Sequence, residues 1–232
     1  ATSMDQVGGT GTATAICGRT SYIGLKSNLG SISVGNNDTP SKRMLANFDP
    51  FPIAAAMGQG AQMWNGSANG TTNGTTPASF SRRQANLITY DMPTMNGFDA
   101  AFAFSAANEA TGADSASTIQ KPRMWSAMAA YTNGPLQLGV TYERHVDYNP
   151  AAAVNYVGGN DAMYSLAAGY TFMGSLKVSG VYNSINYNNI TASQDMSVRT
   201  WGLYADWAVS GPHRVRLGYG AVSYTHLRAH ET

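Results

Sequence analysis

The sequence predicts an antiparallel β-barrel that spans a membrane. Between about Thr20 and Tyr219 the 232-residue chain divides into roughly ten segments of about ten residues, the length of a tilted strand that crosses a bilayer. The connections between them are alternately very short and long, as in outer-membrane barrels. Most segments also alternate apolar side chains with small or polar ones, so each predicted strand has one apolar face.

The composition agrees with a barrel and excludes two other classes of protein. Charged residues make up 12% of the chain, against about 25% in a soluble domain. No stretch approaches the ~18–20 apolar residues of a spanning helix, which excludes a helical membrane protein. The 14 Lys and Arg residues nearly balance the 13 Asp and Glu residues, so the chain has no basic surface for nucleic acid.

Alternation along individual segments assigns side chains to two faces. In the segment 98–105, Phe102 and Phe104 point to one side, and Asp99 and Ala103 point to the other. The apolar face suits lipid and the mixed face suits a wet interior. The charged residues assigned to this lumen-facing side are Asp99, Glu143, Lys177, Asp206, Arg214 and Arg216. The aromatic residues near segment ends, expected to form interfacial girdles, are Tyr22, Tyr90, Phe98, Tyr131, Tyr142, Phe172, Tyr187, Trp201 and Tyr219.

In two segments the alternation does not decide which side meets lipid. In Arg82–Asp91 either side could meet lipid, because Ala85 and Leu87 compete with Ile88 and Tyr90. In Arg123–Thr132 both faces are fairly apolar. We therefore expect part of the second surface there to be buried against a neighbouring subunit.

A connection of some 45 residues, from about Asn37 to Ser81, contains no convincing strand. Compact domains rarely keep so long a connection unless it is functional or disordered. Its first half, Asp38–Met63, carries several prolines and phenylalanines and an Ala/Met-rich run at Ile53–Met57, so it is a candidate to fold into a lumen. The stretch Asn65–Thr76 is rich in Gly, Asn, Ser and Thr and is expected to be mobile and solvated.

No constellation for catalysis or metal binding stands out. His226 and His230 have a spacing of four residues but no third ligand follows. Glu143 and His145 share a strand face, yet no nucleophile with a supporting base accompanies them. We expect no enzymatic activity, no cofactor and no metal site.

The order of several segments resembles the general Gram-negative trimeric porins. Arg19–Pro40 resembles the strand, turn and strand that precede the constriction loop of that family, and Phe48–Phe51 resembles part of the loop itself. Ser81–Pro93 resembles the strand that follows the loop. The runs GFDAAFAFS, WSAMAAYTNGPLQLGVTYERH and MYSLAAGYTF also fit, so the likeness covers nearly all of Thr20–Gly220.

The resemblance implies a 16-stranded barrel in the bacterial outer membrane, assembled as a homotrimer, that lets small hydrophilic solutes and ions diffuse passively. In such porins acidic groups on an inward-folded loop face a ladder of bases on the wall. The residues that match these positions are Asp38 and Asp49 as loop acids, and Arg19, Lys26, Arg82 and Arg83 as wall bases. Only one of Arg82 and Arg83 is expected to point inward. Asn36 and Asn37 stand where family members often carry an arginine, which leaves charge selectivity open.

About ten of the 16 strands are visible, so residues 1–222 are interpreted as part of a porin barrel with its inward-folding loop at 37–81. The segment Ser223–Thr232 looks like translated sequencing-adapter sequence, and we expect it to be a non-native tail that interrupts the strand pattern.

A second function remains open at this stage. Soluble β-sandwiches also alternate apolar and polar residues, so the chain could be a surface or secreted binding or adhesion protein without channel activity. That alternative predicts that Phe102, Leu138 and Trp207 turn toward one another in a dry core, whereas the barrel predicts that they face lipid.

Overall fold

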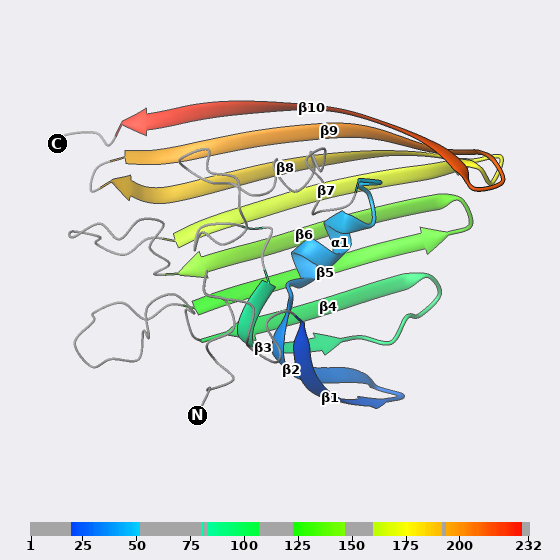
Figure 1. The fold of residues 1–232 in the computed structure, drawn as a ribbon. Coiled ribbons are helices and arrows are strands. Elements are labelled where there is room, and N and C mark those ends of the chain that lie inside the picture. Colours follow the sequence, from blue (N-terminus) through cyan, green and yellow to red (C-terminus); the bar gives the residue numbers. More distant parts are fainter. Residues whose placement is uncertain are drawn as a thin grey trace, which may run out of the picture.

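One antiparallel sheet dominates the protein (Figure 1). The structure is a computed structural model and describes residues 20–51, 80, 83–106, 123–146, 160–191 and 194–228. The ten strands follow one another in sequence order across the sheet, and each pairs antiparallel with the next. Such a meander has only neighbouring strands in contact, as in the wall of an up-and-down barrel.

The elements occupy the segments that the alternation predicts, with one helix added. The strands are β1 (Ser21–Ser27), β2 (Gly30–Asp38), β3 (Arg83–Asp91), β4 (Phe98–Ser105), β5 (Arg123–Asn133), β6 (Leu136–Val146), β7 (Asn160–Phe172), β8 (Leu176–Thr191), β9 (Gln194–Ser210) and β10 (His213–Arg228), and the helix is α1 (Pro40–Ala46). Among the described residues, no helix has both the length and the apolar character needed to cross a bilayer.

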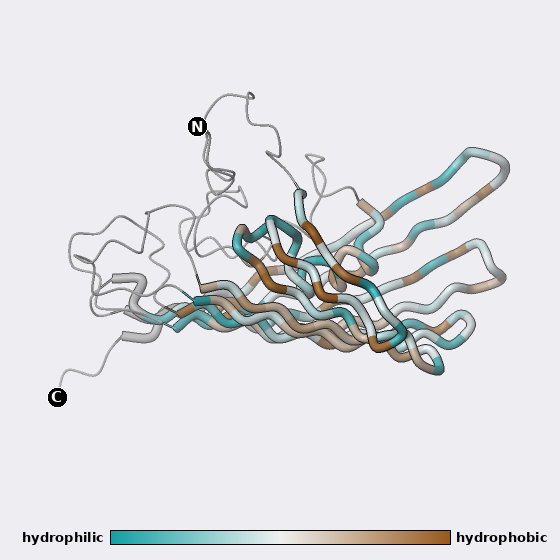
Figure 2. The backbone as a smooth tube through the Cα atoms, turned by 90° about the horizontal axis from the view of Figure 1, so that it is seen from below, coloured by the Kyte–Doolittle hydropathy of each residue, from teal (hydrophilic) through white to brown (hydrophobic). Residues whose placement is uncertain are grey.

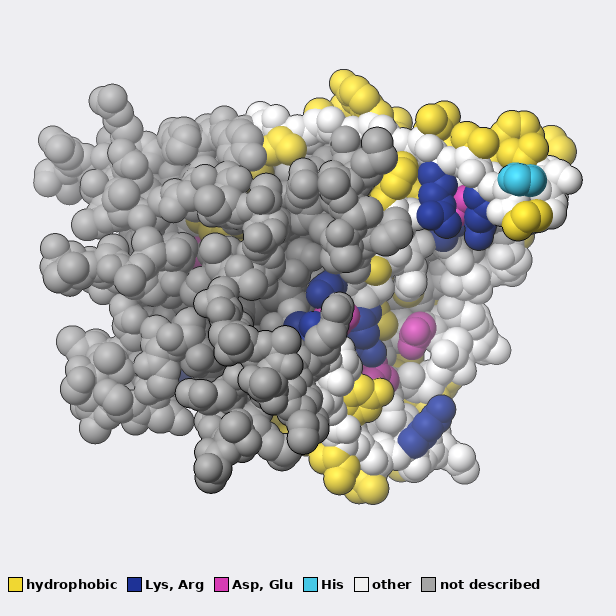
Figure 3. All heavy atoms as spheres, in the orientation of Figure 1, with side chains coloured by type: hydrophobic (Ala, Val, Ile, Leu, Met, Phe, Trp, Pro, Cys, Tyr) yellow, Lys and Arg dark blue, Asp and Glu magenta, His cyan; other side chains and the backbone are white. Residues whose placement is uncertain are grey.

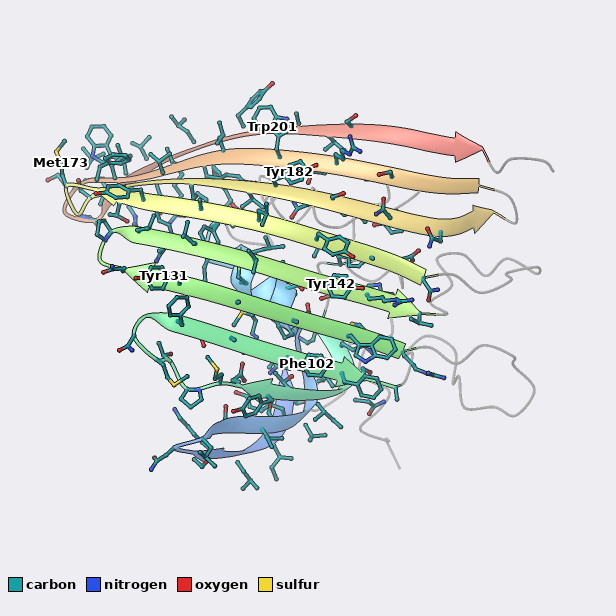
Figure 4. All side chains as sticks on the ribbon, turned by 180° about the vertical axis from the view of Figure 1, so that it is seen from behind. Phe102, Tyr131, Tyr142, Met173, Tyr182 and Trp201 are labelled. Carbon is teal, nitrogen blue, oxygen red and sulfur yellow. The ribbon has the colours of Figure 1, made fainter. Side chains whose placement is uncertain are left out.

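The two faces of the sheet differ as predicted. Phe102, Leu138 and Trp207 are 49%, 42% and 47% exposed on the outer face. Figure 4 shows Phe102 and other aromatic side chains projecting from this outer side. Their strand neighbours Ala103 and Thr141 are buried on the inner face. The three apolar side chains therefore do not meet in a dry core, which contradicts the prediction of the binding-protein alternative.

The sheet curves toward the side that carries α1 (Figure 2). The helix contacts β4, β5 and β6, so the described residues that directly follow β2 lie inside the curve rather than over the rim. The predicted Ala/Met-rich run and the Gly/Asn/Ser/Thr-rich stretch, 53–57 and 65–76, lie outside the described residues.

The helix was not expected, although the sequence carries its start signals. Thr39 is the N-cap, and its hydroxyl accepts a 3.3 Å hydrogen bond from the Lys42 N–H. Pro40 occupies the first helical turn, where its missing N–H costs nothing. A seven-residue helix is too short to be stable alone, so its packing on the sheet must stabilise it.

A missing side chain on β6 lets this helix approach the wall. A Cβ built on Gly139 would lie 2.4 Å from the Met44 sulfur and 3.1 Å from the Phe48 ring. Any larger residue there requires the Met44 side chain or the helix itself to move. Met44, Leu45 and Phe48 are buried in one cluster with Met163 of β7 and other inner-face residues.

The structure shows which side faces outward in β3 and in β5, the two strands for which the sequence left this undecided. In β3, Ile88 is 49% exposed and Leu87 only 1%, so Ile88 and Tyr90 take the outer face. A register shift against β2 and a positive φ at Asn86 (51°) mark a bulge that interrupts the alternation. In β5 the inner-face Ser126 is buried against α1 of the same chain. Part of the inner surface of this strand is therefore covered by α1 and not by a neighbouring subunit.

Several boundaries and orientations differ from the predictions. Tyr187 is 1% exposed on the inner face, and Tyr22 shares its side of β1 with Lys26, so neither belongs to an outer girdle. No long connection separates β8 from β9, because Thr191 pairs with Gln194. Strand β10 pairs with β9 as far as Arg228, since backbone pairing does not depend on the side chains. The foreign origin of Ser223–Thr232 stays a prediction.

Candidate functional site

The segment that follows β2 is tied to the inner wall by buried hydroxyl groups. The Ser41 N–H donates a 3.1 Å hydrogen bond to Ser126 Oγ, and the two hydroxyls lie 2.9 Å apart. The Ser41 hydroxyl also contacts Thr141 Oγ1, which donates to the Ala127 carbonyl oxygen at 2.8 Å. These contacts attach the first turn of α1 to both β5 and β6.

The end of the helix is attached to β8. Lys177 Nζ donates to the Asn47 carbonyl oxygen at 2.7 Å and lies 5.6 Å from the centre of the Phe48 ring. Ser179 Oγ donates to the Phe48 carbonyl oxygen at 2.5 Å. Helix C-terminal carbonyls lack intrahelical partners, and these two side chains satisfy them or their neighbours. A cavity of about 100 Å³ remains beside them, lined by Asn47, Phe48, Pro50, Lys177, Ser179 and Asp206.

Two ion-pair groups flank α1. Asp38 accepts from Lys42 Nζ at 2.8 Å and lies 3.4 Å from Arg83 Nε. Arg43 contacts Asp91 at 2.7 Å. Lys42 is buried, whereas the side chains of Asp38, Arg83, Arg43 and Asp91 are 24–32% exposed, so these partly exposed pairs hold the segment in place only modestly. The structure thus brings together two predicted constriction residues, Asp38 and Arg83, with Lys42 as a second basic partner of the same carboxylate.

The remaining predicted constriction residues are dispersed. Asp49 is 8% exposed, and its Oδ1 accepts from the Phe51 N–H at 2.9 Å, so this carboxylate shapes the loop. Lys26 pairs in register with Ser31 at the far end of β2, seven residues or about 23 Å from Asp38. Arg19 and Arg82 lie outside the described residues.

A basic group with one central carboxylate lies at the short-turn end of the inner face. Asp206 lies 3.1 Å from Arg214 Nε and 3.6 Å from Arg216 Nε. Lys177 and Arg216 are its register partners on β8 and β10. Figure 3 shows basic side chains on both sides of an acidic one in this region. The arginine side chains are 52% and 37% exposed and the carboxylate 14%, so the basic groups are the ones that water reaches.

Two further predicted inner-face acids differ in environment. Asp99 is partly exposed, whereas Glu143 is fully buried. Glu143 Oε1 lies 3.0 Å from His145 Nε2, and the His145 ring stacks on Phe80 with 4.4 Å between centroids. Glu143 is therefore on the predicted face but belongs to packed structure. Within the described ranges, no group of three or more His, Cys, Asp or Glu side chains could hold a metal ion.

Sequence reasoning did not identify the residues that fasten the loop. Ser41, Ser179 and Arg43 carry these contacts, and a serine or arginine has no distinctive pattern by itself. The signal that could have located them is the Thr-Pro start of α1, since a helix there must pack against something.

Comparison with known proteins identifies the family. The model of the Gram-negative porin family matches residues 2–232. The chain belongs to the Gram-negative porin family. Outer membrane porin protein 32 of Delftia acidovorans is 28% identical over 205 residues, which cover 87% of this chain and 53% of that protein.

Solved structures agree on the fold. An anion-selective porin from Comamonas acidovorans matches with a TM-score of 0.65 at 25% identity, over 87% of this chain and 56% of that one. Outer-membrane OmpT of Vibrio cholerae matches with a TM-score of 0.64 at 13% identity, over 90% and 60% of the two chains. The chain spans about half the length of the curated relative it matches.

Family membership assigns the two faces of this porin. The ten strands are part of a porin-type β-barrel in the bacterial outer membrane. The apolar outer face is the lipid-facing one, and the inner face that carries α1 is the lumenal one. In barrels of this kind the short turns lie on the periplasmic side and the longer connections outside the cell.

Proposed function

We propose that the complete protein forms a water-filled channel for passive diffusion of small hydrophilic solutes and ions across the outer membrane, and that it is not an enzyme. The observation that carries this proposal is the docking of α1 and Phe48 inside the curve of the sheet, on the face opposite the apolar one. An inward segment narrows a barrel without filling it, so width and charge at that level set what passes.

The segment 37–81 is proposed as the constriction loop. Its described part is held by hydrogen bonds to β5, β6 and β8, so its position in the bore is fixed by the wall. Asp38, Arg83 and Lys42 would line the constriction as one group in which a single carboxylate faces two basic side chains. Asp49 would stabilise the shape of the loop, and Lys26 would contribute its positive charge nearer the short-turn end of the bore. Arg19 and Arg82 keep their proposed roles as wall bases.

The channel is further proposed to favour anions. Among the described inner-face residues, Asp49, Glu143 and Asp161 are almost completely buried. Arg214 and Arg216 are the more exposed members of their group with Asp206. Water in the bore therefore meets more positive than negative charge, which raises the local anion concentration. The similar porin from Comamonas acidovorans is described as anion-selective, which supports the same direction.

We also propose that the complete protein is a homotrimer in outer-membrane lipid, as the family resemblance implies. Unheated electrophoresis would then give a band near three times the monomer mass that collapses on boiling. A purified, folded protein that migrates and sediments as a monomer would contradict the trimer.

The channel itself is tested by reconstituting the complete protein into planar bilayers. We expect discrete conductance steps, and in a tenfold KCl gradient a reversal potential with the sign of anion preference. Folded protein, verified by heat-dependent mobility, that inserts but never conducts would overturn the channel proposal. A reversal potential of the opposite sign would overturn only the anion preference.

A further inference from the structure

A buried acid and a buried base lie beneath an aromatic ring at the long-connection end of the inner face. Glu143 and His145 are two residues apart on β6, both side chains are 0% exposed, and Glu143 Oε1 lies 3.0 Å from His145 Nε2. The Phe80 ring stacks on the imidazole, with 4.4 Å between centroids and 12° between planes. Phe80 lies near the end of the segment 37–81, three residues before β3 begins, so the stack joins this part of the chain to β6, three strands away.

Further ionisable groups lie beside His145 on the adjacent strands. Asp161 is its register partner on β7. This carboxylate is 3% exposed and accepts a 3.0 Å hydrogen bond from a backbone N–H of β8. The register partner on β5 is the apolar Met124, and Tyr187 of β8 contributes a buried phenol. The described surroundings of the imidazole thus include two carboxylates, those of Glu143 and Asp161.

The basic side chains of α1 and β3 contact other acids. Lys42 of α1 and Arg83 of β3 both lie against Asp38, and Arg43 lies against Asp91. Among the described ion pairs, the partner of Glu143 is His145. The imidazole is therefore the described base that accompanies this buried acid.

Acid changes the charge of this group in one direction. Two ionised carboxylates and one imidazolium give a net charge of minus one, and protonation of both carboxylates changes it to plus one. Carboxylates in water take up protons at about pH 4, below the range in which imidazole becomes charged. Because an unpaired buried charge is costly, burial suits the pH range in which an ionised carboxylate accompanies the imidazolium. At lower pH, opening the group to water becomes favoured.

We propose that Glu143 and His145 are positioning residues that attach Phe80 to the wall at neutral pH and release it in acid. The attachment is fully stable where the Glu143 carboxylate is ionised, and its stability is lost as the pH falls through the titration of that group. The inference rests on the proposed channel for its consequence, a constriction segment whose end is loose in acid. The contact itself does not depend on conduction, because it joins two parts of the same chain.

Cleavage of the chain after Phe80 tests the attachment directly. The complete, detergent-solubilised protein is treated with proteinase K, which cuts after aromatic residues, at about pH 7.5 and about pH 4.5, on either side of the range in which imidazole titrates. Mass spectrometry maps the cuts, and a peptide with the sequence 76–84 corrects for the pH dependence of the protease itself. We expect corrected cleavage of the wild type to rise about tenfold in acid, since uptake of one proton on release shifts the equilibrium by up to about tenfold per pH unit.

A variant without the titrating pair should lose this response. Glu143→Leu/His145→Phe keeps an aromatic ring against Phe80, and apolar replacements of a buried ion pair are often neutral for stability. Its corrected cleavage should change less than about twofold between the two pH values, because the proton-linked pair is gone. Asp99→Asn is the matched control, since it removes a partly exposed inner-face carboxylate on β4 and should keep the wild-type response. Heat-dependent mobility verifies that each variant is folded.

A second variant removes the ring and keeps the pair. Phe80→Leu loses the stack and should be cut at neutral pH as fast as the wild type is cut in acid. Equal wild-type cleavage at both pH values, a full acid response in Glu143→Leu/His145→Phe, or slow cleavage of Phe80→Leu at neutral pH would each refute the attachment.

Recordings in planar bilayers test the consequence separately. Acid should increase closures of the wild-type channel more than those of Glu143→Leu/His145→Phe, and an equal increase in both would contradict the proposed effect on the bore. Protein that never conducts would count against the channel, whereas the cleavage experiment would still decide the attachment.

Discussion

The Ser41 N–H donates a 3.1 Å hydrogen bond to Ser126 Oγ, 85 residues farther along the chain. Both residues are completely buried, and the Ser41 hydroxyl also contacts Ser126 Oγ and Thr141 Oγ1. The first turn of α1 therefore cannot leave β5 without exposing an N–H and breaking two hydroxyl contacts. This relationship joins the inward segment to the wall of the proposed channel.

Replacing the wall partner should loosen the loop. Ser126→Val leaves the Ser41 N–H buried without an acceptor, which costs about 1–3 kcal/mol. We expect the folded protein, seen as a separate band in unheated electrophoresis, to unfold at a lower temperature or urea concentration. Single-channel currents should also be noisier. The matched control Ser184→Val makes the same chemical change on the lipid-facing side of β8. If Ser126→Val and Ser184→Val behave alike, the hydrogen bond does not hold the loop.

Filling the space beneath the helix should displace it. A Cβ on Gly139 would lie 2.4 Å from the Met44 sulfur, so Gly139→Val forces Met44 and Phe48 away from β6. Overpacking of this kind costs about 1–3 kcal/mol. The unfolding midpoint, followed by the folded band in unheated electrophoresis, should fall, and proteases should cut the loop faster. Gly180→Ala is the control, because its Cβ would lie 3.2 Å from the flexible, exposed Leu203 side chain and make an ordinary 3.7 Å contact with the Gly202 carbonyl oxygen, so it should be close to wild type.

The sheet was predictable because its signal is local and repeated. The side-chain period of two survives in β4, β6 and β7, so Phe102 and Leu138 could be assigned to the outer face from the sequence alone. The signal failed where the backbone leaves that period. Near Asn86 a bulge shifts the register, and the consecutive residues Gln84 and Ala85 are both buried, which a period-two count does not predict.

The inner face was less predictable for a different reason. Alternation states which side of the sheet a residue takes, but not whether water reaches it. Glu143 and Asp206 were assigned to the same side, yet Glu143 is fully buried beside His145, whereas Asp206 is 14% exposed between Arg214 and Arg216. That difference depends on long-range contacts, such as the stacking of the Phe80 ring on His145, which no local pattern encodes.

Neutralising the inner arginines should change ion preference more than conductance. Arg214→Gln/Arg216→Gln removes two of the three basic side chains around Asp206 and leaves Lys177 beside it. We expect the reversal potential in a KCl gradient to move toward cation preference, while step size changes less than twofold. The double variant Arg123→Gln/Arg144→Gln removes two charges from the outer face and should leave the reversal potential unchanged. A reversal potential that stays at the wild-type value in Arg214→Gln/Arg216→Gln would contradict the proposed role of this group.

The buried pair on β6 should show strong coupling between its two members. Glu143 Oε1 and His145 Nε2 lie 3.0 Å apart with both side chains fully buried, so removing either one leaves a buried polar partner. Each of Glu143→Leu and His145→Leu should cost about 3–5 kcal/mol if the pair is charged and about 1–3 kcal/mol if it is neutral. The double variant should be more stable than the sum of the singles predicts, because residues in contact couple by up to about 3 kcal/mol. Urea unfolding of the wild type, the two single variants and the double variant, followed by the folded band in unheated electrophoresis, gives the four unfolding free energies of this double-mutant cycle. Additive effects within about 0.5 kcal/mol would mean that the two side chains contribute independently.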